Sequence, residues 1–351
     1  MAKVSVIIPV YNVKSYLSKA LDCICSQTLS ELQIILIDDG STDGSRELCK
    51  MRAEKDERIV VLYQKNSGVS SARNRALDLI NAEYVFFMDA DDYAELNMLE
   101  EMYAAAKQYH CDLVISGFYF ESFTTDRGAA QYPMTFQNVY YPNQDEFRKD
   151  FVQLWDNHLL YNICNKLYRT KIIQEQDLKF PTLDRGEDLC FNELFLEQSH
   201  SFCCLKNCYY HYVRERPGSA TSSYVKNWFQ IRVNEHAELI RCFQYFNVDT
   251  NESREFLARR YIERVIGCIE NEFEDSGYVC PKEQYKAIKN MINHPYTQES
   301  VKFAKPKSTK VKVMLLPIKI NNTFFCFCMG KLIHYVRKNN PELFIRLKQN
   351  R

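Results

Sequence analysis

Short apolar runs alternate with helical patterns through the first third of the chain, and this alternation constrains the fold most. Each run is rich in Val and Ile and ends in polar residues, which is typical of buried strands. The expected strands are 4–10, 34–37, 59–62, 84–88 and 113–116, and the expected helices are 13–26, 43–54 (capped by Ser41 or Thr42), 69–80 and 95–109. Strands that alternate with helices of this length indicate βαβ units with right-handed crossovers. The sequence therefore predicts an α/β fold with a mostly parallel sheet flanked by helices.

Polar side chains follow three of these strands at the point where each strand ends. They are, in chain order, Tyr11-Asn12, Asp38-Asp39 and Asp89-Ala90-Asp91-Asp92. The carboxyl ends of parallel strands meet at one edge of a sheet, where ligands bind in open α/β folds. Three carboxylates in so short a segment repel one another unless a cation lies among them, and a divalent metal is the obvious candidate. An acidic turn before the next helix is the alternative interpretation of this segment, because Asp is a common turn residue.

The later part of the chain contains two more polar segments of interest. An acidic pair, Glu187-Asp188, opens a helix that runs to about residue 198, and a strand over 209–214 leads into a loop with cations, a glycine and hydroxyl groups. Such a loop has the chemistry to bind phosphate. The pattern is helical from 224 through about 273 and again over 281–293, whereas 117–160 is predicted as edge strands and loops.

Two glycine-rich nucleotide signatures are absent from the sequence. No G-x-G-x-x-G follows the first strand, and no G-x-x-x-x-G-K-[ST] occurs. The first is typical of dinucleotide-binding folds and the second of P-loop enzymes. Nucleotide phosphates are therefore expected to be held by a metal ion with Arg or Lys, rather than by a glycine cradle.

The net charge of zero conceals an uneven distribution. Residues 302–351 hold 12 Lys and Arg against one acid, Glu342, so this tail carries +11 and the rest of the chain −11. A basic tail on an acidic body indicates a polyanionic partner. The 14 cysteines come without a signal peptide and without an apolar run near the roughly 18 residues of a membrane span. The sequence therefore predicts an intracellular protein with reduced thiols.

Five motifs, in this order and spacing, resemble family 2 glycosyltransferases with the GT-A fold. They are Val4 to Asn12, Asp38-Asp39-Gly40-Ser41-Thr42-Asp43, Gly68 to Asn74, Asp89-Ala90-Asp91-Asp92 and Gly186-Glu187-Asp188. The chain is most similar to the bacterial enzymes that build capsule, O-antigen and other surface polysaccharides. Each motif alone is weak evidence for the family, but the five in this order are strong evidence. The resemblance covers roughly residues 3–220.

The resemblance implies an inverting transfer of a sugar from a nucleoside diphosphate sugar, with UDP favoured, to a hydroxyl of a glycan acceptor. It also implies Mn²⁺ or Mg²⁺ as cofactor. The expected domains are a GT-A catalytic domain over 1–220 (a nucleotide-binding half, 1–116, and an acceptor half, 117–220), a helical region over 221–301 and a basic amphipathic tail over 302–351. A lipid-linked acceptor is expected because the tail has the character of a membrane-surface segment.

The same resemblance assigns residues to the donor. Asp39 is expected to accept a hydrogen bond from the base N3–H of uracil, and Asp89 to face the ribose and the metal. Asp91 is the expected metal ligand, and the metal offsets the charge that grows on the leaving diphosphate. The guanidinium fork of Arg73 suits a phosphate, although a solvated helix face is the alternative. By the same resemblance, Pro9, Tyr11 and Asn12 wall the nucleoside. The composition and placement of Arg214, Arg216 and Ser219, rather than the resemblance, lead to the hypothesis that they close over the diphosphate when substrate is bound.

Asp188 is the predicted general base, because inversion needs a carboxylate that takes the acceptor proton during the attack. Glu187 either holds the acceptor or stabilises the helix start, where acids are favoured anyway. His211 is either a further metal ligand or a structural histidine in an aromatic strand. Asp92 binds the metal through water or caps the next helix, and Asp38 is expected to act only in the turn.

The tail mixes apolar and aromatic residues with lysines over 311–320 and 323–336. This composition predicts a segment that lies on the anionic inner leaflet of the cell membrane, with the protein on its cytoplasmic side. A basic oligomer contact or an RNA-binding patch is the competing interpretation, and the amphipathic aromatics favour the membrane over nucleic acid.

Two other functions remain as alternatives to a peripheral glycosyltransferase. A sugar nucleotidyltransferase usually carries a glycine-rich basic loop after its first strand, and residues 9–12 (Pro-Val-Tyr-Asn) differ from that pattern. A non-catalytic nucleotide-sugar-binding membrane scaffold is the second alternative, against which Asp91 and Asp188 count.

Overall fold

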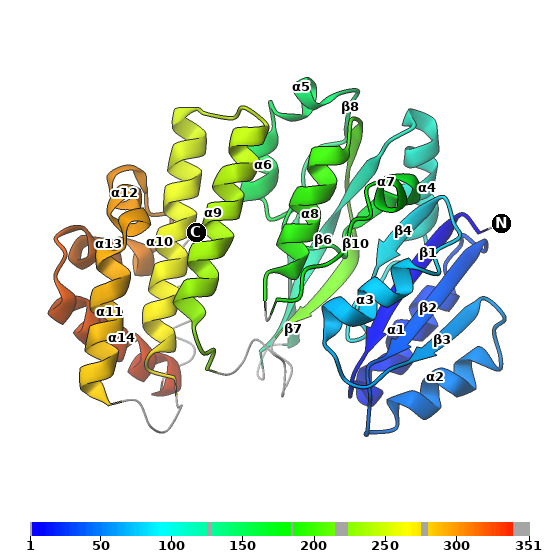
Figure 1. The fold of residues 1–351 in the computed structure, drawn as a ribbon, viewed down its shortest axis with the longest axis horizontal. Coiled ribbons are helices and arrows are strands. Elements are labelled where there is room, and N and C mark those ends of the chain that lie inside the picture. Colours follow the sequence, from blue (N-terminus) through cyan, green and yellow to red (C-terminus); the bar gives the residue numbers. More distant parts are fainter. Residues whose placement is uncertain (1, 125–127, 184, 215–223, 275–279, 340–351) are drawn as a thin grey trace. The chain divides into compact units, whose positions relative to one another are not determined.

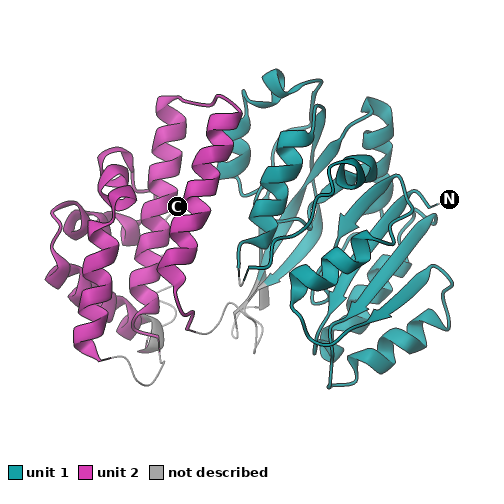
Figure 2. Cartoon of the chain, in the orientation of Figure 1, with its two compact units in different colours: residues 1–216 teal, residues 217–351 magenta. Residues whose placement is uncertain are grey.

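The computed structural model describes residues 2–124, 128–183, 185–214, 224–274 and 280–339 (Figure 1). The chain divides into two compact units, residues 1–216 and residues 217–351 (Figure 2). The first unit contains a sheet with flanking helices. The described part of the second unit contains helices and no strands.

The first unit is built on one ten-stranded sheet with the strand order β3-β2-β1-β4-β9-β6-β10-β5, in which β7 also pairs with β6 and β8 with β10. The strands are β1 (Val4–Val10), β2 (Leu32–Asp38), β3 (Ile59–Tyr63), β4 (Tyr84–Phe87), β5 (Tyr93–Ala94), β6 (Leu113–Thr124), β7 (Gly128–Met134), β8 (Val139–Tyr141), β9 (Lys166–Arg169) and β10 (Phe202–Arg214). The helices are α1 (Lys14–Cys25), α2 (Ser45–Ala53), α3 (Val69–Leu77), α4 (Met98–Tyr109), α5 (Gln144–Phe147), α6 (Phe151–Asp156), α7 (Thr170–Glu175) and α8 (Glu187–Gln198).

The N-terminal half of the sheet is parallel, as its sequence pattern predicts. β1 pairs in parallel with both β2 and β4, and β2 pairs in parallel with β3. Each antiparallel pair contains at least one strand that follows β4 in the sequence. In the sheet, the first of these strands is β9, which lies between β4 and β6 and is antiparallel to both. The predicted α/β fold with helices flanking a large sheet is confirmed.

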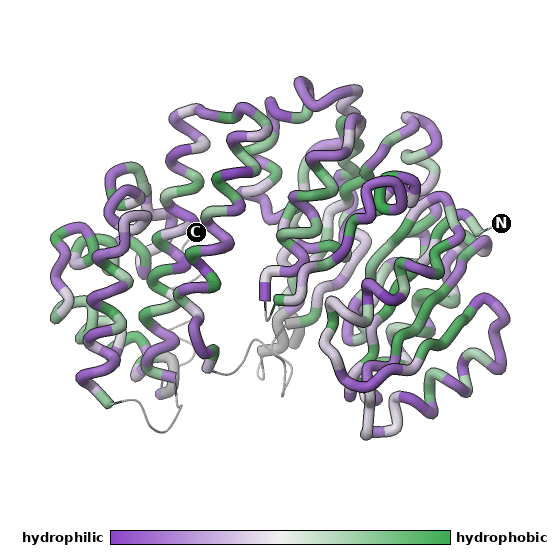
Figure 3. The backbone as a smooth tube through the Cα atoms, in the orientation of Figure 1, coloured by the Kyte–Doolittle hydropathy of each residue, from purple (hydrophilic) through white to green (hydrophobic). Residues whose placement is uncertain are grey.

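Burial explains why β1, β2 and β4 form the centre of this half. None of their residues is exposed, and the hydropathy colouring of these strands is correspondingly apolar (Figure 3). Strands that are buried on both faces read as continuous Val and Ile runs rather than as alternating patterns. The helix α1 buries Leu17, Ala20, Leu21 and Ile24, whose spacing places them on one face of the helix.

The start of α2 differs from the prediction. The helix begins after Gly44, which has a φ of 93°, and neither Ser41 nor Thr42 caps it. Both residues bond to Asn12 instead: the Asn12 amide donates to Ser41 Oγ at 3.1 Å, and the Thr42 amide donates to Asn12 Oδ1 at 2.8 Å. These bonds join the loops that follow β1 and β2.

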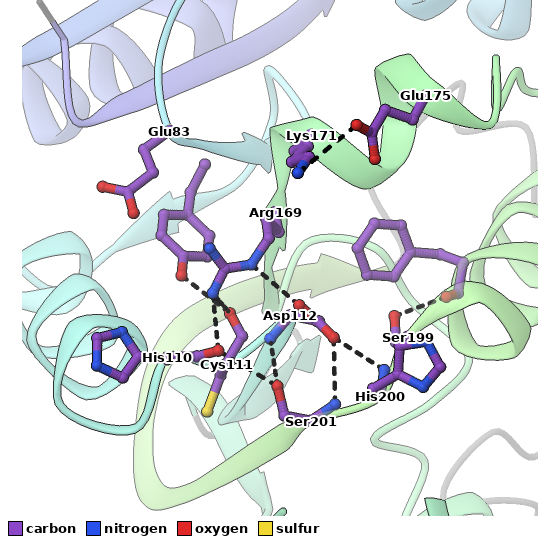
Figure 4. Close-up of polar contacts among 12 residues, drawn as sticks. Glu83, His110, Cys111, Asp112, Arg169, Lys171, Glu175, Ser199, His200 and Ser201 are labelled. Atoms are coloured by element: carbon purple, nitrogen blue, oxygen red, sulfur yellow. Dashed lines mark hydrogen bonds and ion pairs between the residues drawn. The ribbon is translucent and has the colours of Figure 1, made fainter. Parts of the chain in front are cut away.

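An ion pair stabilises the sheet at the amino ends of β6 and β10, away from the loops that follow β1 and β2 (Figure 4). Arg169 Nε lies 3.0 Å from Asp112 Oδ1, and Arg169 also donates to the carbonyls of His110 and Cys111. The other carboxylate oxygen of Asp112 accepts from the amides of His200 and Ser201, at 2.8 and 3.2 Å. Asp112 thus connects β9, β6 and the turn before β10.

We expect Asp112→Ala to lower the free energy of unfolding by about 1–3 kcal/mol, because Arg169 and two backbone amides lose their acceptor. Urea denaturation measures the change. Lys171→Ala is the control, since its pair with Glu175 spans 3.6 Å between side chains that are 73% and 59% exposed. Such exposed pairs contribute about 0–1 kcal/mol. Equal destabilisation by both variants would contradict the structural role of Asp112.

The second unit consists of α9 (Trp228–Tyr245), α10 (Asn251–Asn271), α11 (Pro281–Asn293), α12 (Pro295–Phe303), α13 (Thr309–Lys319) and α14 (Thr323–Asn339). The helical segment predicted from 224 to 273 is divided into α9 and α10, because Thr250 forms a capping box with Ser253 at the start of α10. Inner residues of α13 and α14 belong to the same apolar core as α10. Within the described ranges, no helix combines the length and the hydropathy needed to cross a bilayer.

Candidate active site

A buried arginine on α3 meets three carboxylates from two other elements. Arg73 is 3% exposed, and its Nη1 lies 2.8 Å from Asp188 Oδ1 and 3.6 Å from Glu187 Oε1. Its Nη2 lies 3.0 Å from Asp89 Oδ1. Asp89 follows β4, and the other two acids are in the first turn of α8. The structure therefore brings together four of the residues that the sequence singled out.

Contacts around Phe180 hold these elements in place. Asn74, next to Arg73, donates to the Phe180 carbonyl at 2.8 Å and accepts from the Phe180 amide at 2.7 Å. The Phe180 ring lies 5.2 Å from the Arg73 guanidinium and stacks on Phe191 of α8 at 4.1 Å. Arg73 is thus fixed against the helix that carries Asp188.

Asp188 lies in the first turn of α8, after Gly186 with its φ of 90°. Its side chain is 30% exposed, so a substrate has access to it. Burial of the carboxyl raises the pKa of Asp188 to about 7; Arg73 opposes this shift, and Glu187 and Asp89 reinforce it. A carboxyl with a pKa near neutrality is matched to general base catalysis at physiological pH.

Asp92 ties the acidic segment to β10. Its carboxylate accepts from the Tyr210 hydroxyl at 2.7 Å and from the Val213 amide at 2.8 Å, and it is 2% exposed. Burial, followed by the charges of Asp89 and Asp91, raises the pKa of Asp92 well above its usual value. Asp92 does not cap the next helix, because the N-cap of α4 is Asn97.

The acidic segment offers two carboxylates to a metal, those of Asp89 and Asp91. The Asp89 side chain is 29% exposed, and Asp91 is half-buried. Among the residues that the structure describes, no group of three or more His, Cys, Asp or Glu is arranged to hold a metal on its own. Mg²⁺ is commonly bound through one or two carboxylates together with substrate phosphates. This donor set fits a hard divalent cation that binds with the donor.

His211 has contacts to both of its ring nitrogens. Nδ1 lies 2.8 Å from Glu121 Oε1, and Nε2 lies 2.9 Å from Glu95 Oε1. The ring stacks on Tyr93 at 4.2 Å and on Tyr119 at 5.0 Å, and it is 4% exposed. These are the surroundings of a structural histidine in an aromatic strand. A metal at Nε2 would have to displace Glu95.

Asp39 organises the loop that precedes α3. Its Oδ1 accepts from Gln64 Nε2 and from the Ser67 amide, both at 2.8 Å, and its Oδ2 accepts from the Gly68 amide at 2.9 Å. A base N3–H would share this carboxylate with those donors. Asp38 is fully buried and accepts from Arg46 and from the Ser41 amide, which matches the turn role expected for it.

The nucleoside residues predicted after β1 lie at the same edge of the sheet. Tyr11 is 49% exposed, Asn12 has a φ of 49° and binds the loop after β2, and Pro9 is half-buried within β1. The side chain of Arg214, at the end of β10, and residues Arg216 and Ser219 lie outside the described residues.

Sequence reasoning missed a buried lysine near the site. Lys166 of β9 has no exposed surface and donates to Asn165 Oδ1 at 2.9 Å and to the Asn162 carbonyl. Burial lowers the pKa of Lys166 to about 7, against the effects of Cys164 and Asp188. Lys166 is the first residue of β9, directly before Leu167 and Tyr168, and this position beside two large apolar residues was the signal available in the sequence.

Comparisons with known proteins identify the family and the fold. Residues 5–176 match the family model described as glycosyl transferase family 2. The chain is 33% identical over 242 residues to the glycosyltransferase GlyA of Streptococcus pneumoniae, covering 68% of this chain and 34% of GlyA. It is 33% identical over 274 residues to the cholesterol galactosyltransferase of Borreliella burgdorferi, covering 74% of this chain and 73% of that enzyme.

The fold has a counterpart among solved structures. The crystal structure of Staphylococcus aureus TarS 1-349 in complex with UDP-GlcNAc superposes with a TM-score of 0.65 at 21% identity, covering 95% of this chain and 91% of that one. The likeness confirms the predicted GT-A fold with a helical C-terminal part. From the family match and the relatives together, the chain belongs to glycosyl transferase family 2.

Proposed function

We propose that the chain is an inverting glycosyltransferase that moves a sugar from a UDP-sugar to a hydroxyl of a glycan acceptor in surface polysaccharide synthesis. The observation that carries this proposal is the contact of Asp188 with Arg73, which in turn contacts Asp89. One arginine thereby links the candidate base to the candidate donor and metal segment. In this proposal residues 1–220 form the catalytic domain, with the donor in 1–116 and the acceptor in 117–220.

In this mechanism Asp188 takes the proton of the acceptor hydroxyl as its oxygen attacks the anomeric carbon from the face opposite the diphosphate. Arg73 fixes the orientation of the Asp188 carboxylate, and Glu187, in the same helical turn, holds the acceptor. Mn²⁺ or Mg²⁺ would be held by Asp91 and Asp89 and would offset the charge on the leaving diphosphate. Tyr11, Asn12 and Asp39 contact the nucleoside.

The names of two similar proteins support a proposal for the class of sugar. TarS was crystallised with UDP-GlcNAc, and the Borreliella relative is a galactosyltransferase. These names support a hexosyl or N-acetylhexosaminyl transfer from UDP. The acceptor in this proposal is a lipid-linked glycan at the cytoplasmic face of the cell membrane, where the basic tail 302–351 attaches the enzyme.

Release of UDP from a panel of nucleotide sugars tests the reaction. We expect slow hydrolysis of one UDP-sugar that depends on Mn²⁺ and that Asp91→Asn lowers at least about 100-fold, because the leaving diphosphate loses its charge compensation. Asp22→Asn, at a side chain 62% exposed on α1, is the matched control and should retain full turnover.

Two results would overturn the proposal. Hydrolysis that proceeds equally without Mn²⁺ and in Asp91→Asn would remove the metal assignment. No hydrolysis of any donor, together with a thermal shift by a nucleotide, would indicate the non-catalytic nucleotide-sugar-binding scaffold instead, and no thermal shift by any nucleotide would contradict both functions.

A further inference from the structure

The helix α14 is apolar on two faces. Its inner face carries Cys326, which is fully buried, with Phe327 and Ile333 packed against the core of the second unit. At Gly330 the helix approaches that core so closely that an added Cβ would lie 2.6 Å from the Phe273 ring. This inner packing fixes which residues of α14 face outward.

The outer face of α14 is aromatic. Its exposed large apolar residues are Phe324 (62%), Phe325 (55%), Leu332 (51%) and Tyr335 (64%). At about 100° per residue these four positions fall within one third of the helix circumference. Lys331, also exposed, lies in the same stripe.

The helix α13 repeats this arrangement. It buries Val311, Met314 and Ile318 in the core of the second unit. On its outer face Val313 (47%), Leu316 (63%) and Ile320, just after the helix (59%), are exposed, together with Lys312 and Lys319. Their spacing again confines them to one stripe of the helix.

The most exposed large apolar side chains of the described residues are concentrated in and directly after these helices. Within the described residues, the large apolar side chains that are at least 55% exposed are Leu316, Ile320, Phe324, Phe325 and Tyr335. A group of exposed aromatic and aliphatic residues, unlike single ones, marks an interaction surface.

Charge decides what kind of partner this surface fits. Residues 302–339 contain nine Lys and Arg and no Asp or Glu. A second copy of the same surface would place lysine against lysine. An anionic bilayer fits both the exposed apolar side chains and the lysines, because the apolar side chains enter the acyl boundary while the lysines reach the lipid phosphates.

We propose that α13 and α14 form a bilayer-binding surface that attaches the protein to anionic phospholipid without spanning the membrane. We define this surface by Val313, Leu316, Ile320, Phe324, Phe325, Leu332 and Tyr335 with Lys312, Lys319 and Lys331. The inference rests on the membrane attachment stated in the proposed function and names its residues, and it holds whichever sugar the enzyme transfers.

Flotation of the full chain with vesicles tests the surface. We expect binding to vesicles of 30% phosphatidylglycerol in phosphatidylcholine, and much weaker binding to phosphatidylcholine alone. The combined variant Lys312→Glu, Lys319→Glu and Lys331→Glu should lower the partition coefficient at least about 100-fold at low salt, since each cation near the surface is worth about fivefold. Its control is Lys50→Glu, Lys55→Glu and Lys206→Glu, three exposed lysines of the first unit, which should change binding little.

The apolar part has its own variant. Leu316→Ser, Phe324→Ser and Phe325→Ser together should lower the partition coefficient about 100-fold or more, and the fold should be retained because these side chains are exposed. Met51→Ser with Tyr245→Ser, at side chains 42% and 46% exposed, is the control. Donor hydrolysis in solution should be unchanged in all four variants, so a failure of this inference is separable from a failure of the proposed reaction.

Three outcomes would overturn the proposal. One is equal binding to neutral and anionic vesicles, or no binding to either. A second is a stable dimer that the serine variant converts to monomer while vesicles fail to compete. The third is RNA binding that depends on the lysines alone and exceeds the affinity for vesicles.

Discussion

Asp188→Asn should lower kcat for sugar transfer by about 10²–10⁴-fold and leave nucleotide affinity within about threefold. The amide has nearly the size and shape of the carboxylate, but it does not accept the acceptor proton. Asp188 is 30% exposed and paired with Arg73 at 2.8 Å, so an acceptor hydroxyl reaches a carboxylate whose orientation is already fixed. Steady-state kinetics with a saturating donor, together with nucleotide titration, separates the two effects.

The pH dependence of the wild-type enzyme should follow the same group. Because the pKa of Asp188 is raised to about 7, the base is protonated below that pH and deprotonated above it. We therefore expect kcat/KM to fall as the pH decreases below about 7, and the remaining activity of Asp188→Asn to lack this acid limb. Asp78→Asn, 67% exposed in the same unit, should keep it. Near-full turnover of Asp188→Asn would show that another group is the base.

The parallel half of the sheet was predictable because its strands are buried on both sides. The apolar runs of β1, β2 and β4 are only 7, 7 and 4 residues long and are followed by polar turn residues, and these two features distinguish them from buried helices. The strand β7 gives no such signal. Its sequence, Gly128 to Met134, mixes glycine, alanine and proline without alternation, and it becomes a strand through pairing with β6 rather than through its own periodicity.

The candidate site was predictable as a set of residues but not as a set of contacts. The order of the motifs identified Asp89 and Asp188 as candidate site residues, yet the sequence gives no indication that one arginine contacts both. Arg73 and Asp188 are 115 positions apart. They become neighbours only because the fold packs α8, which carries Asp188, near α3, which carries Arg73. For the same reason the sequence assigned Arg73 to a phosphate and gave no role to Lys166.

Arg73→Gln should shift the acid limb of the kcat/KM profile to higher pH and lower the free energy of unfolding by about 2–3 kcal/mol. Arg73 is the larger of two cations, the other being Lys166, that lower the pKa of Asp188 against the effect of burial, so without it the base holds its proton to a higher pH. Breaking a buried ion pair typically costs about 3–5 kcal/mol. The smaller figure applies here because the acids that remain are 17–30% exposed.

Arg75→Gln is the matched control, two residues further along α3. Arg75 is exposed and donates to the Tyr63 carbonyl, so its replacement should leave both the pH profile and the stability nearly unchanged. Arg73→Lys should give an intermediate result, because an ammonium keeps the charge but does not present the planar fork that contacts two acids at once.

The shape of the pH profile distinguishes the two roles open to Arg73. If the guanidinium serves to orient Asp188 and to tune its pKa, the activity of Arg73→Gln should recover in part as the pH is raised toward 9, with donor affinity little altered. If it binds the donor diphosphate, as the sequence predicts, donor affinity should fall about tenfold or more, since hydrogen bonds to charged groups contribute about 1.5–3 kcal/mol, and the acid limb should stay near pH 7. The contacts with Asp188 and Asp89, at 2.8 and 3.0 Å, favour the first outcome, because they occupy both terminal nitrogens of the guanidinium with carboxylates of the protein itself.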